Sequence, residues 1–319
     1  MPDFQSVAHF FLYPSDYLTF DAIHQNVPEI DHTMRRRLIT AVVFVAVMFA
    51  GMLSGKFSFT ALFGVITTLC LWEFFDMVFE DGQKGNLIRK IMAVLFGLLP
   101  YIAVSLLHLN TWGREPQQLY LVSFTLLPIV FLCFIFELFS KAAHPFNNVA
   151  LTLLGMTYIS APFSMLNVIA FNGESFSPNI VMGLLFMIWS NDTGAYLVGS
   201  RFGKTKLLPR ISPKKTWEGF IGGFVLTFLV GWGLSNYYTE IETRDWLVLA
   251  GITSVFGTIG DLVESMLKRS FEVKDSGKLL PGHGGFLDRF DAFMFLIPFA
   301  TAYILWLRYT VQDFPIITP

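Results

Sequence analysis

Apolar stretches long enough to cross a lipid bilayer recur along the chain, and they limit its fold to a bundle of membrane helices. A helix needs roughly 20 mostly apolar residues to cross the hydrocarbon core. Charged residues make up only 14% of the 319 positions, whereas a soluble domain carries about 25%. The sequence therefore predicts an all-α, polytopic integral membrane protein. We place nine candidate spans at about 38–54, 57–79, 90–108, 119–139, 149–170, 179–199, 218–235, 246–266 and 290–309.

The distribution of lysine and arginine predicts how these spans are oriented. If the N-terminus is cytoplasmic, nine spans place 18 of the 22 Lys and Arg residues on the cytoplasmic side. The opposite side keeps only Lys56, Arg114, Arg244 and Arg308. Cytoplasmic loops of membrane proteins carry an excess of Lys and Arg, and removing one span would disrupt this alternation. We therefore expect about nine transmembrane helices and a cytoplasmic N-terminus.

Residues 1–33 differ from the rest of the chain, and we treat them as an N-terminal arm ahead of a membrane domain at 34–319. The arm contains no Lys or Arg and shows no sustained hydrophobic period, so we expect it to lie at the cytoplasmic membrane surface. Met34 followed by Arg35–Arg37 would itself make an ordinary start for a membrane protein. The arm is therefore a candidate for a dispensable segment. Both cysteines lie inside apolar runs, and we interpret them as small buried hydrophobic residues.

Four polar side chains in the eighth candidate span follow helical spacing. Asp261, Glu264, Ser265 and Lys268 stand at positions i, i+3, i+4 and i+7, so they share one face of a helix. Such a face must meet protein or a water-filled cavity, because exposing charge to lipid is costly. Two interpretations follow. The face is a functional site, or Asp261 and Lys268 form a structural pair that holds two helices together.

The loop after this span favours a functional site. It runs from Lys274 to Asp291 and contains three glycines around His283. Glycine has no Cβ, so the backbone can approach a ligand closely. Basic residues flank the glycines, and Asp288 follows at the start of the last span. Carboxylates hold Mg²⁺, the metal bridges phosphate oxygens, and cations neutralise the remaining charge. The cluster therefore predicts a site for a metal-bound polyphosphate.

These residues resemble the signature of the phosphatidate cytidylyltransferases, also called CDP-diacylglycerol synthases. The matching positions are Ser265, Leu267, Lys268, Arg269, Lys274, Asp275, Gly277, Pro281, His283, Gly284, Gly285, Asp288, Arg289 and Asp291. A second segment is similar to the same family and comprises Ser190–Gly199, Phe202–Lys204 and the Ser-Pro-Lys-Lys-Thr motif that begins at Ser212. The resemblance covers roughly the last third of the chain, in two catalytic segments at about 190–219 and 261–291.

The resemblance implies a CTP-dependent nucleotidyltransferase of phospholipid biosynthesis. Such an enzyme transfers the cytidylyl group of CTP to phosphatidic acid and gives CDP-diacylglycerol and pyrophosphate. It also implies a bacterial cytoplasmic membrane, an active site on the cytoplasmic side, and lipid but no nucleic acid as a partner. Mg²⁺ is the implied metal, with K⁺ as a candidate second cation.

The resemblance also assigns roles to individual residues. We expect Asp261 and Asp288 to bind the metal, with Ser265 beside Asp261. The candidates for holding phosphate groups are Lys214, Lys215, Lys268, Arg269 and Arg289. The residues assigned to the site with roles left open are Asp192, Lys274, Asp275, Asp291 and His283. A phosphate nucleophile is already ionised, so we expect His283 to hydrogen-bond a phosphate or the loop rather than to carry a proton.

Two other functions stay open. A CTP-dependent lipid kinase of the polyprenol or phytol type would share the membrane architecture and the nucleotide, but would transfer the γ-phosphoryl group. A secondary transporter would place its carboxylates near the bilayer midplane. The charges here cluster at the predicted cytoplasmic ends of the spans, and the sequence has no visible inverted repeat, so a transporter is disfavoured.

Small residues line one side of the seventh span. Gly219, Gly223, Thr227 and Gly231 recur every fourth residue, a spacing that lets helices approach closely. This stripe predicts packing against another span of the chain or against a second subunit in a homodimer.

Overall fold

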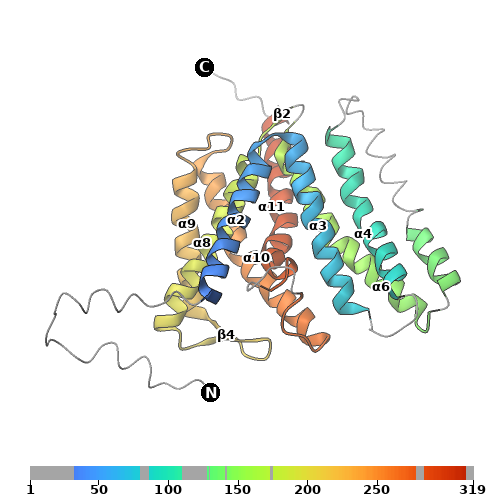
Figure 1. Ribbon diagram of the computed structural model, residues 1–319. Coiled ribbons are helices and arrows are strands. Elements are labelled where there is room, and N and C mark those ends of the chain that lie inside the picture. The colour runs from blue at the N-terminus through green and yellow to red at the C-terminus, as the bar shows by residue number, and fades with distance from the viewer. Residues whose placement is uncertain are drawn as a thin grey trace, which may run out of the picture.

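Long helices run side by side between the two ends of a bundle (Figure 1). The computed structural model describes residues 32–79, 86–109, 128, 130–140, 142–172, 175–277 and 284–313. Residues 1–31 of the predicted N-terminal arm and His283 therefore lie outside the described residues, and the last two residues of the arm belong to the helix that begins at His32. The dispensability of the arm stays a prediction.

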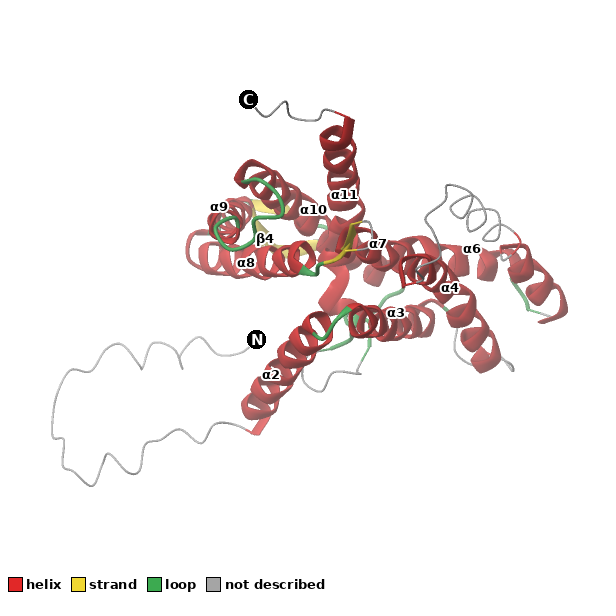
Figure 2. Cartoon of the chain, turned by 90° about the horizontal axis from the view of Figure 1, so that it is seen from above, coloured by secondary structure: helices red, strands yellow, loops and turns green. Residues whose placement is uncertain are grey.

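The helices form two groups with α11 (Leu287–Asp313) and α7 (Ala161–Ala170) between them, as Figure 2 shows from above. One group consists of α8 (Asn179–Phe202), α9 (Trp217–Leu234) and α10 (Thr243–Ser270). The other consists of α3 (Lys56–Val78), α4 (Asn86–Leu109) and α6 (Pro145–Gly155), with α2 (His32–Leu53) packed against α3. A π-helical turn, Met156–Ser160, joins α6 to α7.

Among the described residues, six helical stretches are long and apolar enough to cross a membrane, which confirms a multi-pass helical membrane protein. They are Lys56–Val78, Leu87–Leu109, Pro145–Ala170, Trp217–Leu234, Thr243–Ser270 and Leu287–Thr310. Shorter apolar helices cover Ile39–Leu53 and Val130–Ser140, and α8 has the length of a span but is interrupted by polar residues from Ser190 to Thr193. These three helices coincide with the remaining candidate spans. Much of the span at 119–139 lies outside the described residues, so the total of nine stays a prediction.

Aromatic side chains pack the two groups together. Phe74 of α3, Phe163 of α7, and Phe290 and Phe293 of α11 are almost fully buried. The rings of Phe163 and Phe290 meet edge to face, with centroids 5.7 Å apart. In a membrane the surrounding lipid is itself apolar, so these rings stabilise the bundle through close van der Waals packing rather than through removal from water. These contacts fix the start of α11, which carries part of the second catalytic segment, against α3 and α7.

The small-residue stripe of α9 packs inside the chain. A Cβ added at Gly219 would lie 2.9 Å from the backbone oxygen of Ala195 in α8, and one at Gly231 would lie 3.1 Å from Ala250 Cβ in α10. Thr227 Oγ1 donates to the backbone oxygen of Met187 at 3.4 Å. The stripe therefore packs against α8 and α10 of the same chain, which is the first of the two predicted alternatives. A homodimer stays a prediction that this stripe does not support.

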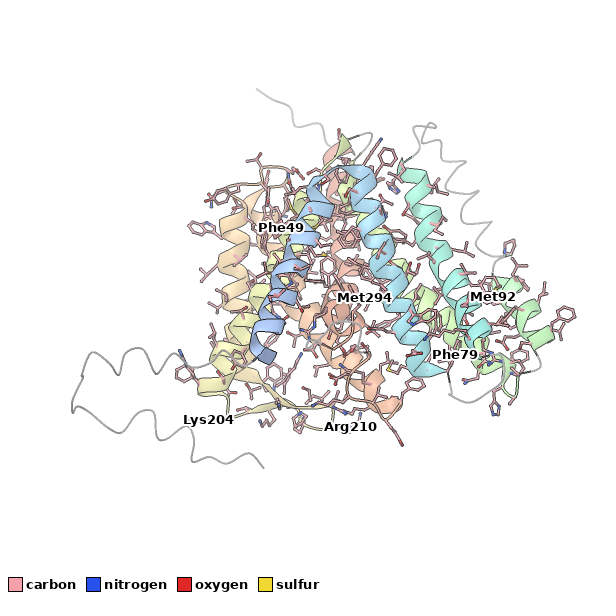
Figure 3. The ribbon with its side chains drawn as sticks, viewed as in Figure 1. Phe49, Phe79, Met92, Lys204, Arg210 and Met294 are labelled. Carbon is pink, nitrogen blue, oxygen red and sulfur yellow. The ribbon has the colours of Figure 1, made fainter. Side chains whose placement is uncertain are left out.

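Two short hairpins interrupt the all-α pattern. β1 (Phe171–Asn172) pairs with β2 (Ser175–Phe176), and β3 (Lys206–Leu208) pairs with β4 (Ser212–Thr216). Proline disfavours the helical conformation of the residue before it, so Pro213 favours the extended conformation at the start of β4. Figure 3 places Lys204 and Arg210 of this hairpin region at the lower end of the bundle, where α2 begins.

Candidate active site

The two catalytic segments meet at the lower end of the bundle in Figure 1. The first segment contributes the end of α8 and the β3–β4 hairpin, and the second contributes the end of α10 and the start of α11. Close packing of α8, α9 and α10 brings these elements together. Their charged side chains form the candidate site.

Glu218, in the first turn of α9, fixes the hairpin to the helix that follows it. Its carboxylate accepts hydrogen bonds from the backbone N–H groups of Lys204 and Thr205, at 3.1 and 3.0 Å. The Oγ1 of Thr216 caps α9 by accepting from Gly219 N at 3.2 Å. The Thr216 hydroxyl thereby satisfies an N–H group in the first turn of α9 that has no partner within the helix. The hairpin is thereby held in one position beneath α10.

Lys215 links the first catalytic segment to the second. Its Nζ lies 2.5 Å from Asp261 Oδ2 of α10, whereas the neighbouring Lys214 is exposed. Successive side chains of a strand point to opposite faces, which explains why only one of the two lysines reaches α10. The interpretation of Asp261 as the structural partner of Lys268 is wrong, because the ion-pair partner of Asp261 is Lys215.

Lys268 lies between two carboxylates. Its Nζ is 2.5 Å from Glu264 Oε2 and 2.8 Å from Asp288 Oδ1. The Glu264 side chain is fully buried and that of Asp288 is 9% exposed. The predicted polar face of α10 is thus present, and on it Ser265 Oγ donates to Asp261 Oδ1 at 3.4 Å. Lys268 also forms an ion pair with Asp288 of α11.

Asp288 organises the loop that precedes it. Its oxygens accept from Lys268 Nζ, from Ser276 N at 3.1 and 3.2 Å, and from Gly285 N at 2.9 Å. Gly284 has a φ of +80°, a conformation that glycine adopts readily. The chain can therefore turn back, and Gly285 N faces Asp288.

Two further carboxylates extend the negative charge of the site. Asp192 of α8 and Asp291 of α11 both interact electrostatically with Asp261. Lys215, Lys268 and Arg289 interact with members of this group and offset part of the charge. The result is an alternating arrangement of carboxylates and cations drawn from four separate elements.

The fit of this arrangement to Mg²⁺ differs between the two predicted ligands. Carboxylate oxygen is the ligand that Mg²⁺ prefers, and the Asp261 side chain is 35% exposed. The Asp288 oxygens already accept from three separate donors, which leaves little lone-pair capacity for a metal. Among the described residues, no three His, Cys, Asp or Glu side chains are grouped to hold a metal. Of the two predicted ligands, Asp261 therefore fits Mg²⁺ better, and the Lys215 ammonium group occupies a position beside it that a metal cation could take.

Other predicted residues lie around this centre. Lys214, Arg269, Lys274 and Asp275 are exposed at the same end. Arg269 Nη1 donates to the backbone oxygen of Val273 at 3.3 Å, which closes the end of α10. These side chains are accessible to a ligand, but they do not join the buried ion pairs.

Sequence reasoning missed Glu73 of α3. Its side chain contacts the second catalytic segment, where Glu73 Oε2 accepts from Ser276 Oγ at 3.2 Å and from Leu287 N at 3.0 Å. A signal was present, because an ionisable residue inside an apolar span suggests a functional role by default.

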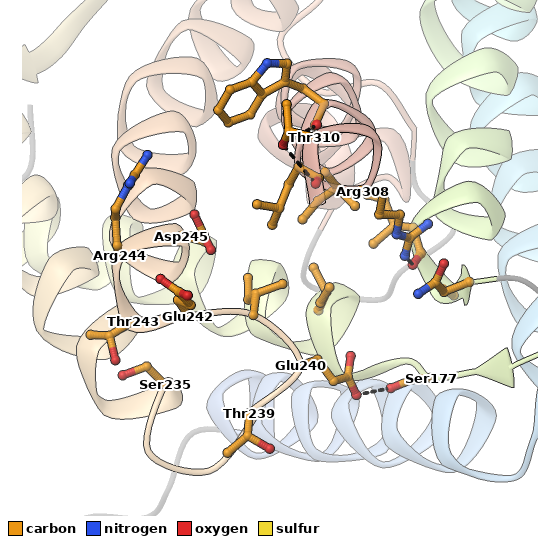
Figure 4. Close-up of a pocket in the computed structure, with 18 of the residues that line it drawn as sticks. Ser177, Ser235, Thr239, Glu240, Glu242, Thr243, Arg244, Asp245, Arg308 and Thr310 are labelled. Carbon is orange, nitrogen blue, oxygen red and sulfur yellow. Dashed lines mark hydrogen bonds between the residues drawn. The ribbon is translucent and has the colours of Figure 1, made fainter. Parts of the chain in front are cut away.

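A pocket of about 1250 Å³ opens at the opposite end of the bundle. Figure 4 shows its lining, which includes Glu240, Asp245 and Arg308. Arg308 donates to the backbone oxygens of Val168, Ile169 and Phe171. The pocket contains none of the predicted site residues and is separate from the candidate active site.

The fold and the site together define a polytopic α-helical membrane protein with a charged centre at one end of its bundle. The chain belongs to the cytidylyltransferase family, whose profile matches residues 35–307. This confirms the resemblance and extends it over the earlier spans.

Individual relatives carry a more specific name. The chain is 33% identical over 269 residues to a protein of Staphylococcus aureus (strain COL) named phosphatidate cytidylyltransferase, and the match covers 83% of this chain and 96% of the relative. Proteins of the same name from Staphylococcus saprophyticus and Staphylococcus haemolyticus are 33% and 32% identical over 267 residues, with the same coverage.

Proposed function

We propose that this chain transfers the cytidylyl group of CTP to phosphatidic acid, giving CDP-diacylglycerol and pyrophosphate. Relatives named phosphatidate cytidylyltransferase align with 83% of the chain, which supports this activity. The observation that carries the proposal is the Lys215–Asp261 ion pair, because it joins the two segments that match the family into one centre. A centre of alternating carboxylates and cations suits a metal-bound nucleotide.

The proposed reaction is an in-line displacement at phosphorus. A phosphate oxygen of phosphatidic acid forms a bond to the α-phosphorus of CTP, and the bond from that phosphorus to the bridging oxygen of the β-phosphate breaks. Pyrophosphate leaves with the bonding electrons. The attacking phosphate is already ionised, so no side chain has to remove a proton. Positioning and charge neutralisation supply most of the catalysis in such transfers.

The cations of the site would supply this neutralisation. Lys215 and Lys268 are paired with carboxylates, and phosphate groups are alternative anionic partners for both. Arg289 and the exposed Lys214 are further candidates for phosphate contact. A lysine or arginine that leaves a carboxylate to bind a phosphate is paired with an anion both before and after the substrate binds.

Asp261 and Asp288 are the proposed ligands of Mg²⁺. When bound at these carboxylates, the metal would supply positive charge that offsets the charge developing on the leaving pyrophosphate. Asp261 Oδ2 pairs with Lys215, but Oδ1 accepts only a long hydrogen bond from Ser265, at 3.4 Å. Binding at Asp288 would compete with the hydrogen bonds that both of its oxygens already accept. Asp261 is therefore the stronger ligand candidate. K⁺ as a second cation is a proposal, and Asp192, Asp275, Asp291 and His283 are proposed members of the site without individual roles.

The proposed orientation puts the site on the cytoplasmic side of a nine-span bundle. The clustering of Lys204, Arg210 and the charged centre at one end is consistent with the positive-inside rule. A reporter inserted near Pro209 should be cytoplasmic, and one fused after Pro319 should lie on the other side. Two reporters on the same side would contradict nine spans.

The position of the label in CTP tests the reaction itself. Purified protein in phosphatidic acid micelles is given CTP labelled at either the α- or the γ-phosphorus. We expect the lipid to gain the α-label and the γ-label to appear in pyrophosphate. A lipid that gains the γ-label would identify a CTP-dependent kinase instead.

A further inference from the structure

Glu73 stands out because it is a buried carboxylate inside an apolar helix. The residue is 2% exposed, and its neighbours in α3 include Phe74 and Phe75, which are also buried. Burial of an ionisable group is costly unless hydrogen bonds compensate it. Glu73 Oε2 receives this compensation from Ser276 Oγ and Leu287 N, which stand 203 and 214 residues further along the chain. Glu73 Oε1 is buried without a hydrogen-bond partner among the described residues.

The glycines of the second catalytic segment pack directly on this carboxylate. A Cβ added at Gly277 would overlap Glu73 Oε1, and one added at Gly285 would overlap Glu73 Oε2 and Ser276 Oγ. Neither Gly277 nor Gly285 has a positive φ, so backbone conformation does not require glycine at these positions. Glycine is required at these positions because the Glu73 side chain occupies the space that a Cβ would fill.

Asp288 holds the same segment from the opposite side. Ser276 gives its backbone N–H to Asp288 and its hydroxyl to Glu73. Gly285 N donates to Asp288, and Leu287 N donates to Glu73. One carboxylate from α3 and one from α11 thus hold Ser276 on one side of residues 278–283, and Gly285 and Leu287 on the other. Hydrogen bonds to charged acceptors are roughly twice as strong as neutral ones.

We propose that Glu73 is a positioning residue for the cytidylyl transfer, acting through Ser276 and Leu287, which it holds, rather than on the substrates. The inference rests on the proposed function. Ser276 and Leu287 border Lys274 and Asp275 on one side and lead into Asp288 on the other, and Asp288 in turn orients Lys268. Release of Glu73 therefore loosens several candidate phosphate-binding groups together. If this residue only packed α3 against α11, an apolar side chain would be sufficient, because that packing requires no charge.

The test compares Glu73→Gln with a matched variant on the same helix. Glutamine keeps the size of the side chain but removes the charge and turns one acceptor into a donor. Asp76→Asn makes the same chemical change one turn away, where the carboxylate pairs with Lys90 and not with the loop. Ser276→Ala, which removes one hydrogen bond to Glu73, replaces Glu73→Gln if that variant does not fold.

Two measurements are made on each purified protein. Hydrogen exchange of peptides covering 274–289 reports the loop directly, and we expect exchange about tenfold faster or more in Glu73→Gln, from the loss of charge-assisted hydrogen bonds. Steady-state kinetics should give a kcat about tenfold lower with the KM for phosphatidic acid changed by less than about twofold, because a mispositioned loop weakens transition-state contacts. The double variant with Ser276→Ala should be little worse than Glu73→Gln alone.

Asp76→Asn should match the wild type in both measurements. A Glu73→Gln protein with wild-type loop exchange, or with faster exchange but unchanged kcat, would overturn the inference. If the wild type has no cytidylyltransferase activity, the proposed function fails. The exchange result still decides whether Glu73 holds Ser276 and Leu287.

Discussion

Removal of the Lys268 charge should destabilise the protein strongly. The Lys268 side chain is 14% exposed, and its ammonium group lies between a fully buried Glu264 and an almost buried Asp288. Lys268→Met keeps the length and the apolar stem but leaves both carboxylates without their cation. Loss of one partner from a buried ion pair costs about 3–5 kcal/mol, because the remaining charge is uncompensated. We expect a loss of this size, which corresponds to a fall in Tm on the order of 10 °C.

The assay is thermal unfolding of detergent-purified variants at one detergent and lipid concentration. Lys206→Met serves as the control, because Lys206 is exposed on β3 and surface substitutions usually change stability by less than about 0.5 kcal/mol. The double variant Glu264→Gln/Lys268→Met removes the buried charge together with its partner and should recover more than half of the lost Tm.

Two results would refute this reasoning. If Lys268→Met has the Tm of the wild type, then loss of the Lys268 ammonium group does not leave an uncompensated charge on Glu264. A double variant no more stable than Lys268→Met would mean that the damage comes from lost packing. Activity should stay low in the double variant even when stability returns, since Lys268 is also a candidate to hold phosphate.

Three further predictions concern other parts of the account. Lys215→Met should lower turnover by roughly 100-fold or more while shifting Tm only slightly, because its pair with Asp261 is partly exposed and exposed pairs contribute about 0–1 kcal/mol; unchanged turnover would remove Lys215 from the site. Gly285→Ala should lower both Tm and turnover, because the added Cβ overlaps Glu73 Oε2; a fully stable and active variant would contradict the packing described. Protein that starts at Met34 should insert and keep its activity, and a folded but inactive truncation would give the arm a direct role.

The sequence predicted most of the membrane helices because each signal is local. A run of apolar residues identifies a span without reference to any other part of the chain. The polar face of α10 was likewise predictable from helical spacing alone, and Ser265 and Asp261 do lie together. The short hairpins were missed, since strands of two to five residues leave no periodic pattern.

The pairing of charges within the site was less predictable, because it depends on how distant elements pack. The choice between Lys214 and Lys215 follows from the face of β4 that meets α10, and the sequence contains both lysines. The apolar span around Glu73 was a signal for a functional role, but its contacts were not predictable for the same reason, since its partners lie 203 and 214 residues away. Motif spacing identifies which residues belong to a site, whereas tertiary packing decides which of them touch.

The Asp261→Asn variant tests the central claim that this carboxylate binds the catalytic metal. Asparagine preserves size and much of the hydrogen bonding but removes the negative charge. Turnover per folded molecule and Tm are measured together on the same preparation, with Asp288→Asn and the double variant alongside. Loss of a catalytic metal removes several kcal/mol of transition-state stabilisation, and each 1.36 kcal/mol is about tenfold in rate.

We therefore expect a fall of orders of magnitude in turnover for Asp261→Asn, with the protein still folded. The double variant should be little worse than the worse single variant, because residues that act as one unit are not additive. An Asp261→Asn protein that is stable and turns over CTP at the wild-type rate would contradict the account.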